Sequence, residues 1–388
     1  MKLKRRPEDF QVEELSDFGA DGGPFALYRL TKRSLGTPEA VTAVLRRWKI
    51  PRHRVSYGGL KDRHAITHQF VTIQGGPRRD LAQTNLELVY QGQASRPFGP
   101  RDIAGNRFQI TLRDVSPDDR ERLERQLAAL VREGLPNYFD DQRFGSVGES
   151  GEFVARAWCA GQYERALWLA LADPHPYDRP GERAQKRLLR EHWGDWALCQ
   201  ERLGRSHRRS VVTYLAARPE DFRGAIARLR VDLRGLYLSA FQSDLWNQVL
   251  AAFLRQTCRD EQLVPVGTDS GPLPFYHDLE PAQAASLSAA RLPLPSARTK
   301  IADAATRRLV EEVLAGEGLE LRALRVKYPR DSFFSKGDRA AVFFPAGLRH
   351  AGADDELYAG RTRLTLGFDL PRGCYATLVI KRLSASGP

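Results

Sequence analysis

The sequence predicts an α+β protein in which a sheet formed by both ends of the chain is interrupted by a mostly helical segment. Strand-like patterns occur near both ends, and long segments of helical period lie between them. The chain has 388 residues, 42% of them apolar, which is enough for two or three domains with their own cores. We therefore expect one domain from residues 1–150 plus 341–388, and an inserted domain from 151–340.

In the first segment, strands and helices alternate. The stretch 25–31 alternates between apolar and polar residues like a half-buried strand, and the stretches 69–73 and 107–115 are also strand-like. Thr37 and Pro38 have the residue types of a helix start, and Pro51 closes that helix. Ser116 is typical of the cap of a second helix, which Gly134 ends. This part of the chain therefore predicts a sheet with at least two helices.

The middle and the end of the chain differ in pattern. The helical period is found in three long stretches: 153–172, 236–256 and 301–318. The last part returns to strand-like sequence at 361–370 and 374–383, with a turn at 371–373 between them. We expect these terminal strands to rejoin the first sheet.

The charge suggests a polyanionic partner. Lys and Arg number 60 against 48 Asp and Glu, which gives a net charge of +12 and a pI near 9.7. Residues 176–234 contain fourteen bases and eight acids. A GC-rich genome accounts for much of the arginine content, whereas the net excess favours binding to nucleic acid. The segment also lacks the basic amphipathic pattern of a membrane-surface helix.

Several other classes of protein are disfavoured. No run approaches the roughly 18 apolar residues of a membrane helix, and the amino-terminal residues lack a signal-peptide core. The four cysteines are far apart in sequence and form no zinc or redox motif. We expect a cytoplasmic protein without a metal or cofactor. His64 and His68 have a spacing that metal sites use on helices, but their segment favours a strand, which would separate the two rings.

Candidate chemistry lies in polar groups placed beside aromatic residues and bases. Asp62 follows a double glycine and lies between Lys61 and Arg63, so nearby positive charge would favour its ionised form. An ionised carboxylate can act as a nucleophile or general base, although an isolated charged turn is usually a solvated loop. The stretch 137–145, NYFDDQRFG, combines rings and amides that can stack on and hydrogen-bond to a nucleobase. Taken alone, such rings can equally fold back onto a core.

Two further stretches have plain structural interpretations. The stretch 7–14, PEDFQVEE, is expected to form an edge strand. The stretch 371–383 places Tyr375 in or beside a strand, where packing is the default role.

Together these segments resemble the TruD family of tRNA pseudouridine synthases. The resemblance rests on five stretches, namely PEDFQVEE, GGLKDRHAITHQF, NYFDDQRFG, LSAFQSDLWNQ and LPRGCYATLVIKRL, which lie between residues 7 and 383. It is weak at about 160–235 and 255–340. The resemblance implies a pseudouridine synthase catalytic domain with a mixed, mainly antiparallel sheet, interrupted by a mostly helical TRUD insertion domain, and a basic RNA cleft.

The resemblance also implies roles for five residues. Asp62 falls on the family's catalytic aspartate, and the uridine pocket falls on Phe10, Asn137, Phe139 and Tyr375. The chain departs from the family at two positions. Asp140 stands where glycine is usual and adds a charge beside the pocket. Tyr375 replaces the more familiar phenylalanine, and its hydroxyl offers a hydrogen bond to RNA or to Asp62.

The implied activity is isomerisation of uridine to pseudouridine in tRNA, at position 13 of the D arm, by an aspartate acting on a flipped-out base. Such a reaction needs no cofactor. No obligate protein partner is indicated, and a monomer is the default expectation. The alternatives are a non-catalytic RNA-binding protein, a synthase acting on another RNA, and a different nucleic-acid enzyme. A glycosidase would need a second carboxylate, and a metal nuclease would need an acidic cluster.

Overall fold

The computed structural model describes residues 1–326 and 328–385, which form two compact units. The first unit contains Met1–Gly134 and Phe344–Leu383, and the second contains the described residues of Leu135–Phe343 together with Ser384 and Ala385. The chain thus leaves the first unit and returns to it. The boundaries between the two compact units lie at residues 134/135 and 343/344. The functional division at 150/151 and 340/341 stays a prediction, and the stretch 135–150 packs with the second unit.

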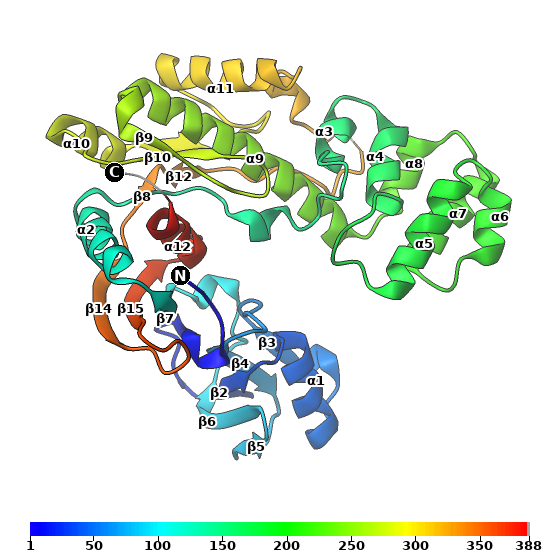
Figure 1. Ribbon diagram of the computed structural model, residues 1–388. Coiled ribbons are helices and arrows are strands. Elements are labelled where there is room, and N and C mark those ends of the chain that lie inside the picture. The colour runs from blue at the N-terminus through cyan, green and yellow to red at the C-terminus, as the bar shows by residue number, and fades with distance from the viewer. Residues whose placement is uncertain (327, 386–388) are drawn as a thin grey trace. The chain divides into compact units, whose positions relative to one another are not determined.

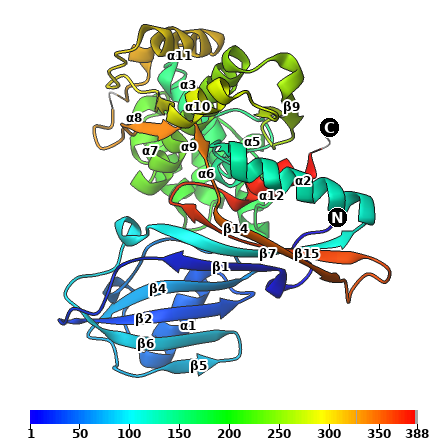
Figure 2. The ribbon, with the colours of Figure 1, turned by 90° about the vertical axis from the view of Figure 1, so that its left-hand side faces the viewer.

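The first unit is built on a nine-stranded sheet (Figure 2). Its hydrogen-bonded order is β14 (Ala346–Asp354), β15 (Thr362–Pro371), β7 (Gly105–Val115), β1 (Phe10–Leu15), β4 (Ile66–Gln74), β2 (Phe25–Arg33), β6 (Leu86–Ala94) and β5 (Leu81–Gln83), while β3 (Val55–Tyr57) also pairs with β4. Strands β1 and β4 run parallel, whereas the neighbouring pairs on either side run antiparallel. The expected mixed, mainly antiparallel sheet is therefore confirmed, and β15 from the end of the chain joins it.

Strand β1 lies in the interior of this sheet. It pairs with β4 on one side and with β7 on the other, so the expectation of an edge strand at residues 7–14 is wrong. Phe10, Val12 and Glu14 are buried in alternation along it. Glu14 is buried because it lies on the same face of the strand as Phe10 and Val12, whereas Glu13 on the other face is partly exposed.

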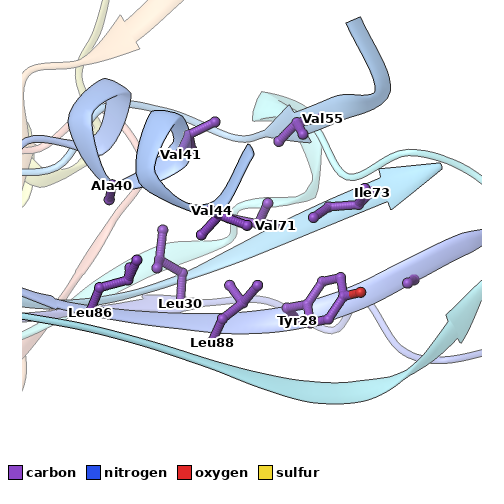
Figure 3. Packing of buried hydrophobic residues seen from close by; sticks show 11 residues of the cluster. Tyr28, Leu30, Ala40, Val41, Val44, Val55, Val71, Ile73, Leu86 and Leu88 are labelled. Atoms are coloured by element: carbon purple, nitrogen blue, oxygen red, sulfur yellow. The ribbon is translucent and has the colours of Figure 1, made fainter. Parts of the chain in front are cut away.

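Helix α1 (Thr37–Trp48) covers one face of the β2, β4 and β6 part of the sheet (Figure 3). Val41 and Val44 of the helix pack with Tyr28, Leu30 and other buried apolar residues of the strands. Gly36 is the cap residue, so the helix starts one position earlier than a Thr37 cap would place it. This packing fixes β2 and β4 against each other.

Helices α2 (Pro117–Glu133) and α12 (Ala376–Ser384) cover the β14, β15 and β7 part of the sheet (Figures 1 and 2). Ser116 caps α2 by accepting a hydrogen bond from the backbone nitrogen of Asp119, and Gly134 ends the helix at a positive φ of 69°, as expected. The expected strand at 374–383 is wrong, because α12 occupies most of it. The buried residues Val379 and Leu383 have the i, i+4 spacing of one helical face.

The second unit is mostly helical. Its helices are α3 (Val154–Cys159), α4 (Tyr163–Leu171), α5 (Pro180–Glu191), α6 (Trp196–Arg202), α7 (His207–Ala217), α8 (Phe222–Ala227), α9 (Val231–Thr257), α10 (Pro281–Ala289) and α11 (Ala304–Gly316). Three two-stranded sheets join β9 (Leu263–Val266) to β10 (Leu273–Tyr276), β11 (Arg291–Pro293) to β12 (Asp338–Ala340), and β8 (Leu135–Pro136) to β13 (Val342–Phe343). The short helices α3–α8 gather at one end of the long helix α9 (Figure 1).

Short 3₁₀ helices join several of these elements. They are η1 (Pro7–Asp9), η2 (Arg52–Arg54), η3 (Pro100–Asp102), η4 (Asp141–Phe144), η5 (Asp260–Gln262) and η6 (Leu321–Ala323). Among the described residues, no helix has both the length and the apolar character to cross a bilayer. No disulfide joins the four cysteines, all of which lie in the described part of the chain.

Candidate active site

Asp62 lies in the loop between β3 and β4 of the first unit. A Cβ atom at Gly58 would come within 2.5 Å of the Ile103 side chain and 2.9 Å of the Phe98 ring. A residue with a side chain would therefore push the start of the loop away from its support. Gly59 has open space at the same position, so the double glycine meets a steric requirement only at Gly58.

Three side chains hold the backbone of this loop. The ammonium group of Lys32 donates hydrogen bonds to the carbonyl oxygens of Asp62, at 2.7 Å, and Lys61, at 3.3 Å. The Thr37 hydroxyl accepts a hydrogen bond from the Lys61 backbone nitrogen at 3.0 Å and donates one to the Gln69 side chain at 2.8 Å. Gln69 in turn donates to the carbonyl oxygen of Gly59 at 3.2 Å. Such a network of buried side chains fixes the position of the loop.

The bases on either side of Asp62 turn toward other carboxylates. Lys61 lies 3.1 Å from a carboxylate oxygen of buried Glu14, and Arg63 lies 3.2 Å from Glu39. Burial raises the pKa of Glu14, while the charge of Lys61 and hydrogen bonds from Phe70 and Lys61 oppose that rise. The expectation that Lys61 and Arg63 are the cations beside Asp62 is therefore not met in this geometry.

Lys4 forms the ion pair with the Asp62 carboxylate. Its ammonium nitrogen lies 3.7 Å from Asp62 Oδ1 and 3.9 Å from the centre of the Phe10 ring. The Asp62 side chain is 36% exposed, so it can reach a ligand from solvent. Phe10 is buried and packs edge-on against Phe108. The structure thus brings Asp62 and Phe10 together around one ammonium group.

Tyr375 also belongs to the first unit, directly before α12. Its carbonyl oxygen accepts a hydrogen bond from the Leu378 backbone nitrogen at 3.2 Å, which starts the helix. Its side chain is partly exposed. The predicted site residues Phe10, Asp62 and Tyr375 therefore share one unit.

Asn137 and Phe139 belong to the second unit. The Asn137 amide is buried and engaged there: its nitrogen donates to the Ala340 carbonyl at 3.0 Å, and its oxygen accepts from Arg339 at 2.6 Å. The Arg339 guanidinium lies 4.1 Å from the centre of the Phe139 ring, which packs edge-on against Trp246. Asn137 therefore orients an arginine against an aromatic face.

Asn247 fixes the backbone of the same segment. Its amide accepts from the Phe139 nitrogen and donates to the Phe139 carbonyl, both at 2.8 Å. Asp140, which departs from the usual glycine, is buried and is the residue that precedes η4. Its carboxylate therefore lies within the fold of the second unit, where the sequence had led us to expect an added charge beside the pocket.

The two histidines near Asp62, His64 and His68, lie in different structural elements, a loop and a strand. His68 is in β4, and its Nδ1 shares a hydrogen bond with the Thr31 hydroxyl at 2.9 Å, while His64 lies in the loop before that strand. Burial lowers the pKa of His68, and the charge of Arg29 adds to that effect. In the described part of the chain, no three His, Cys, Asp or Glu side chains gather as a metal site would require.

The family model for TruD, tRNA pseudouridine synthase D, matches residues 1–383. The chain belongs to the TruD family of tRNA pseudouridine synthases. The "Probable tRNA pseudouridine synthase D 2" of Methanocaldococcus jannaschii is 32% identical, over 98% of this chain and 91% of that protein. The tRNA pseudouridine synthase D of Aquifex aeolicus is 28% identical, over 100% of this chain and 98% of its own.

The likeness to the TruD family extends to three dimensions. A crystal structure from Methanosarcina mazei that carries the TruD name superposes with a TM-score of 0.74 and 25% sequence identity. The match covers 98% of this chain and 93% of the other. The family and the fold expected from the sequence are thus confirmed.

Sequence reasoning missed three basic residues around the positions that it assigned. Lys4 lies beside the Asp62 carboxylate, and Lys32 donates to the Asp62 backbone carbonyl. Arg339 lies on the Phe139 ring. Lys4 was visible only as part of a basic amino-terminal run. For the other two, no local pattern distinguishes them from the remaining bases, and their roles depend on pairings far apart in the chain.

Proposed function

We propose that this TruD-family protein isomerises uridine to pseudouridine in tRNA, at position 13 of the D arm, and that Asp62 is the catalytic group. The observation that carries the proposal is a partly exposed carboxylate on a loop held by buried side chains, beside an ammonium group and an aromatic ring. A fixed carboxylate with access to a ligand is what nucleophilic or general-base chemistry requires. Membership of the family supplies the reaction class.

The chemistry is an internal rearrangement. The C1′–N1 bond breaks, the base turns, and a C1′–C5 bond forms. C5 then loses its proton and N1 gains one, so atoms and electrons balance without an added reactant. Asp62 would act first, either by attacking the nucleotide or by removing a proton from the sugar. The Lys4 ammonium nitrogen, 3.7 Å from Asp62 Oδ1, is the positive charge beside this carboxylate in either route.

The target base must leave its stack, which costs a few kcal/mol. We propose that Phe10, Tyr375, Asn137 and Phe139 recover part of this cost, the rings by packing and Asn137 through the Arg339 that it orients. In this proposal, residues 1–150 and 341–388 form the catalytic domain, and residues 151–340 form the insertion domain. The bases of 176–234 would then bind phosphates without reading sequence.

The test compares the wild-type protein with Asp62→Asn on bulk tRNA that lacks pseudouridine, with base-specific labelling that blocks reverse transcription at modified uridines. We expect a stop at position 13 with the wild type only, and equal tRNA affinity for both proteins. A stop with both proteins would remove Asp62 from its role. A stop at another uridine would change the site but keep the reaction, and binding without any stop would favour the non-catalytic RNA-binding protein.

The same assay can separate the two routes for Asp62. Deuterium at C2′ of the target uridine slows the reaction if Asp62 removes that proton in the rate-limiting step. Equal rates with hydrogen and deuterium would favour direct attack on the nucleotide. The comparison needs single-turnover conditions, so that product release does not hide the chemical step.

A further inference from the structure

The second unit contains a cavity of about 480 Å³ that is lined by the end of α3, the start of α4, η6 and residues after η6. Its main lining side chains are Trp158, Cys159, Tyr163, Arg322, Arg325 and Tyr328. The volume lies within the range of roughly 300–1,000 Å³ that ligand pockets of proteins occupy. None of the five residues expected to act on the target uridine is among the lining residues.

The lining combines aromatic faces with guanidinium groups. Among the described lining residues there is no Asp or Glu, although acids make up 48 residues of the chain. Rings of Trp and Tyr can stack on a nucleobase, and an arginine can bind its phosphate through parallel hydrogen bonds. This combination therefore fits a nucleotide better than an apolar ligand or a cation.

The two arginines are not equivalent. The Arg322 guanidinium lies 2.6 Å from the Glu320 carboxylate, in a solvent-exposed ion pair that a phosphate would have to displace. For Arg325, no carboxylate partner is found within residues 1–326 and 328–385, and its side chain is exposed. Arg325 is therefore the guanidinium that is available to a phosphate.

The wall of the cavity is held in place before any ligand arrives. Arg156 of α3 lies 2.6 Å from a Glu317 carboxylate oxygen and also donates to the Glu317 carbonyl at 3.1 Å, which ties α3 to the end of α11. Trp158 is only 4% exposed. Burial raises the pKa of the Cys159 thiol to about 12, so this group stays neutral. A preformed wall reduces the ordering cost of binding.

Tyr328 provides the accessible ring. It is 44% exposed, and the Arg223 guanidinium lies 5.5 Å from its ring centre. Arg223 covers one face of the Tyr328 ring and orients it, so the other face is an aromatic surface near Arg325. A base and its phosphate can therefore be bound by neighbouring residues of one segment.

We propose that this cavity binds one unpaired nucleotide of the RNA substrate, other than the target uridine, with its base on Tyr328 and its phosphate on Arg325. The proposal rests on the proposed function for the identity of the RNA. A nucleotide held in the second unit would contribute to the choice of RNA without taking part in the reaction.

The first experiment measures the dissociation constant of tRNA at several salt concentrations for Tyr328→Ala, Tyr328→Phe and Arg325→Ala. Arg308→Ala is the matched control, because Arg308 is exposed on α11 and does not line the cavity. We expect Tyr328→Ala to weaken binding by about fivefold to 150-fold with an unchanged salt dependence, and Tyr328→Phe to restore it. Arg325→Ala should weaken binding and reduce the slope of log K against log salt by about 0.7–0.9.

Wild-type affinity for Tyr328→Ala and Arg325→Ala at every salt concentration would overturn the proposal. So would a loss in Arg308→Ala equal to that in Arg325→Ala, because the effect would then be one of general charge. Titration with adenosine and uridine monophosphates gives the second arm. Binding of a free nucleotide that needs Arg325, with unchanged tRNA affinity, would assign the cavity to a small molecule and overturn its role in RNA binding.

Isomerisation by the wild-type protein is measured separately, so the two proposals can fail independently. If pseudouridine forms and the cavity variants bind tRNA normally, the inference fails and the proposed function stands. If no pseudouridine forms but the cavity variants lose RNA affinity as expected, the cavity is supported and the proposed function fails.

Discussion

The ammonium group of Lys32 donates a 2.7 Å hydrogen bond to the backbone carbonyl oxygen of Asp62. The Lys32 side chain is fully buried, at 0% exposure. Burial lowers its pKa to about 8, while the charge of Asp62 opposes that shift. A buried lysine is costly unless its donors are used, and here two donors hold the loop that carries the proposed catalytic carboxylate. We therefore regard Lys32 as a positioning residue.

Replacement of Lys32 by methionine should impair catalysis without abolishing RNA binding. The carbonyls of Lys61 and Asp62 would lose their donor, and a shift of the loop by about 1 Å can lower the rate of a reaction by about 100-fold. We expect that loss in the single-turnover rate, with tRNA affinity nearly unchanged. Lys300→Met, at an exposed lysine, is the control. An equal fall in affinity and rate would show that Lys32 acts on binding.

Lys32 also predicts a dependence of stability on pH. Its pKa is about 8 in the folded protein and about 10.4 in an unfolded chain. Between these values the unfolded chain binds the additional proton, so the stability of the wild type relative to Lys32→Met should rise with pH. Below about pH 8 the difference should be flat. Urea unfolding at pH 7, 9 and 10 checks this, and an identical difference at all three would contradict it.

Local patterns predicted those elements whose signals lie within a few residues. Ser116 and Gly134 mark the two ends of α2, and the alternation at 25–31 marks β2. The prediction of a strand at 374–383 failed because a short apolar run fits a strand or a buried helix equally well. Packing of α12 against the sheet decided between them, and no local signal carries that information.

The site shows the same limit. Asp62 and its glycines are adjacent in sequence and were found, whereas Lys4 and Lys32 are distant from them in sequence and meet the loop only in the folded chain. Lys32 lies thirty residues before Asp62 and reaches it because β2 pairs with β4. Strand order and register depend on the whole sheet, so residues that converge through them cannot be identified from single segments.

The buried Arg113 is expected to be the most sensitive ionic residue of the first unit. Its guanidinium lies 2.8 Å from Asp9 and 2.9 Å from Asp355, and all three side chains are at most 3% exposed. Removal of the cation in Arg113→Ala leaves two buried carboxylates, which should cost about 3–5 kcal/mol of unfolding free energy. Arg107→Ala is the control on the same strand. Its pair with Asp369 is solvent-exposed, so Arg107→Ala should change the unfolding free energy far less than Arg113→Ala.

The loss of unfolding free energy in Arg113→Ala should depend on pH. Burial of Asp355 acts to raise its pKa, but hydrogen bonds from the backbone of Asp114 and Leu357 and from Arg113 lower it overall. A lowered carboxylate pKa gives stability above the unfolded value of about 3.9 that is lost as pH falls through the folded value. Urea unfolding should therefore show the effect of Arg113→Ala in full at pH 7 and diminished in acid. An effect of equal size at pH 3 would count against the ionic explanation.

Tyr375 provides a test of the departure from the family's phenylalanine. Tyr375→Phe keeps the ring and loses one hydroxyl, whose hydrogen bond contributes about 0.5–1.5 kcal/mol, or roughly twofold to tenfold. Tyr375→Ala removes the ring as well, and the loss of stacking should reach about 1–3 kcal/mol. If the hydroxyl bonds to RNA, Tyr375→Phe should weaken tRNA affinity; if it bonds to Asp62, it should lower the single-turnover rate at saturating tRNA. Tyr177→Phe, at an 88% exposed tyrosine, is the control. Full activity of Tyr375→Ala would remove Tyr375 from the uridine pocket, because neither the ring nor the hydroxyl would then contribute to the reaction.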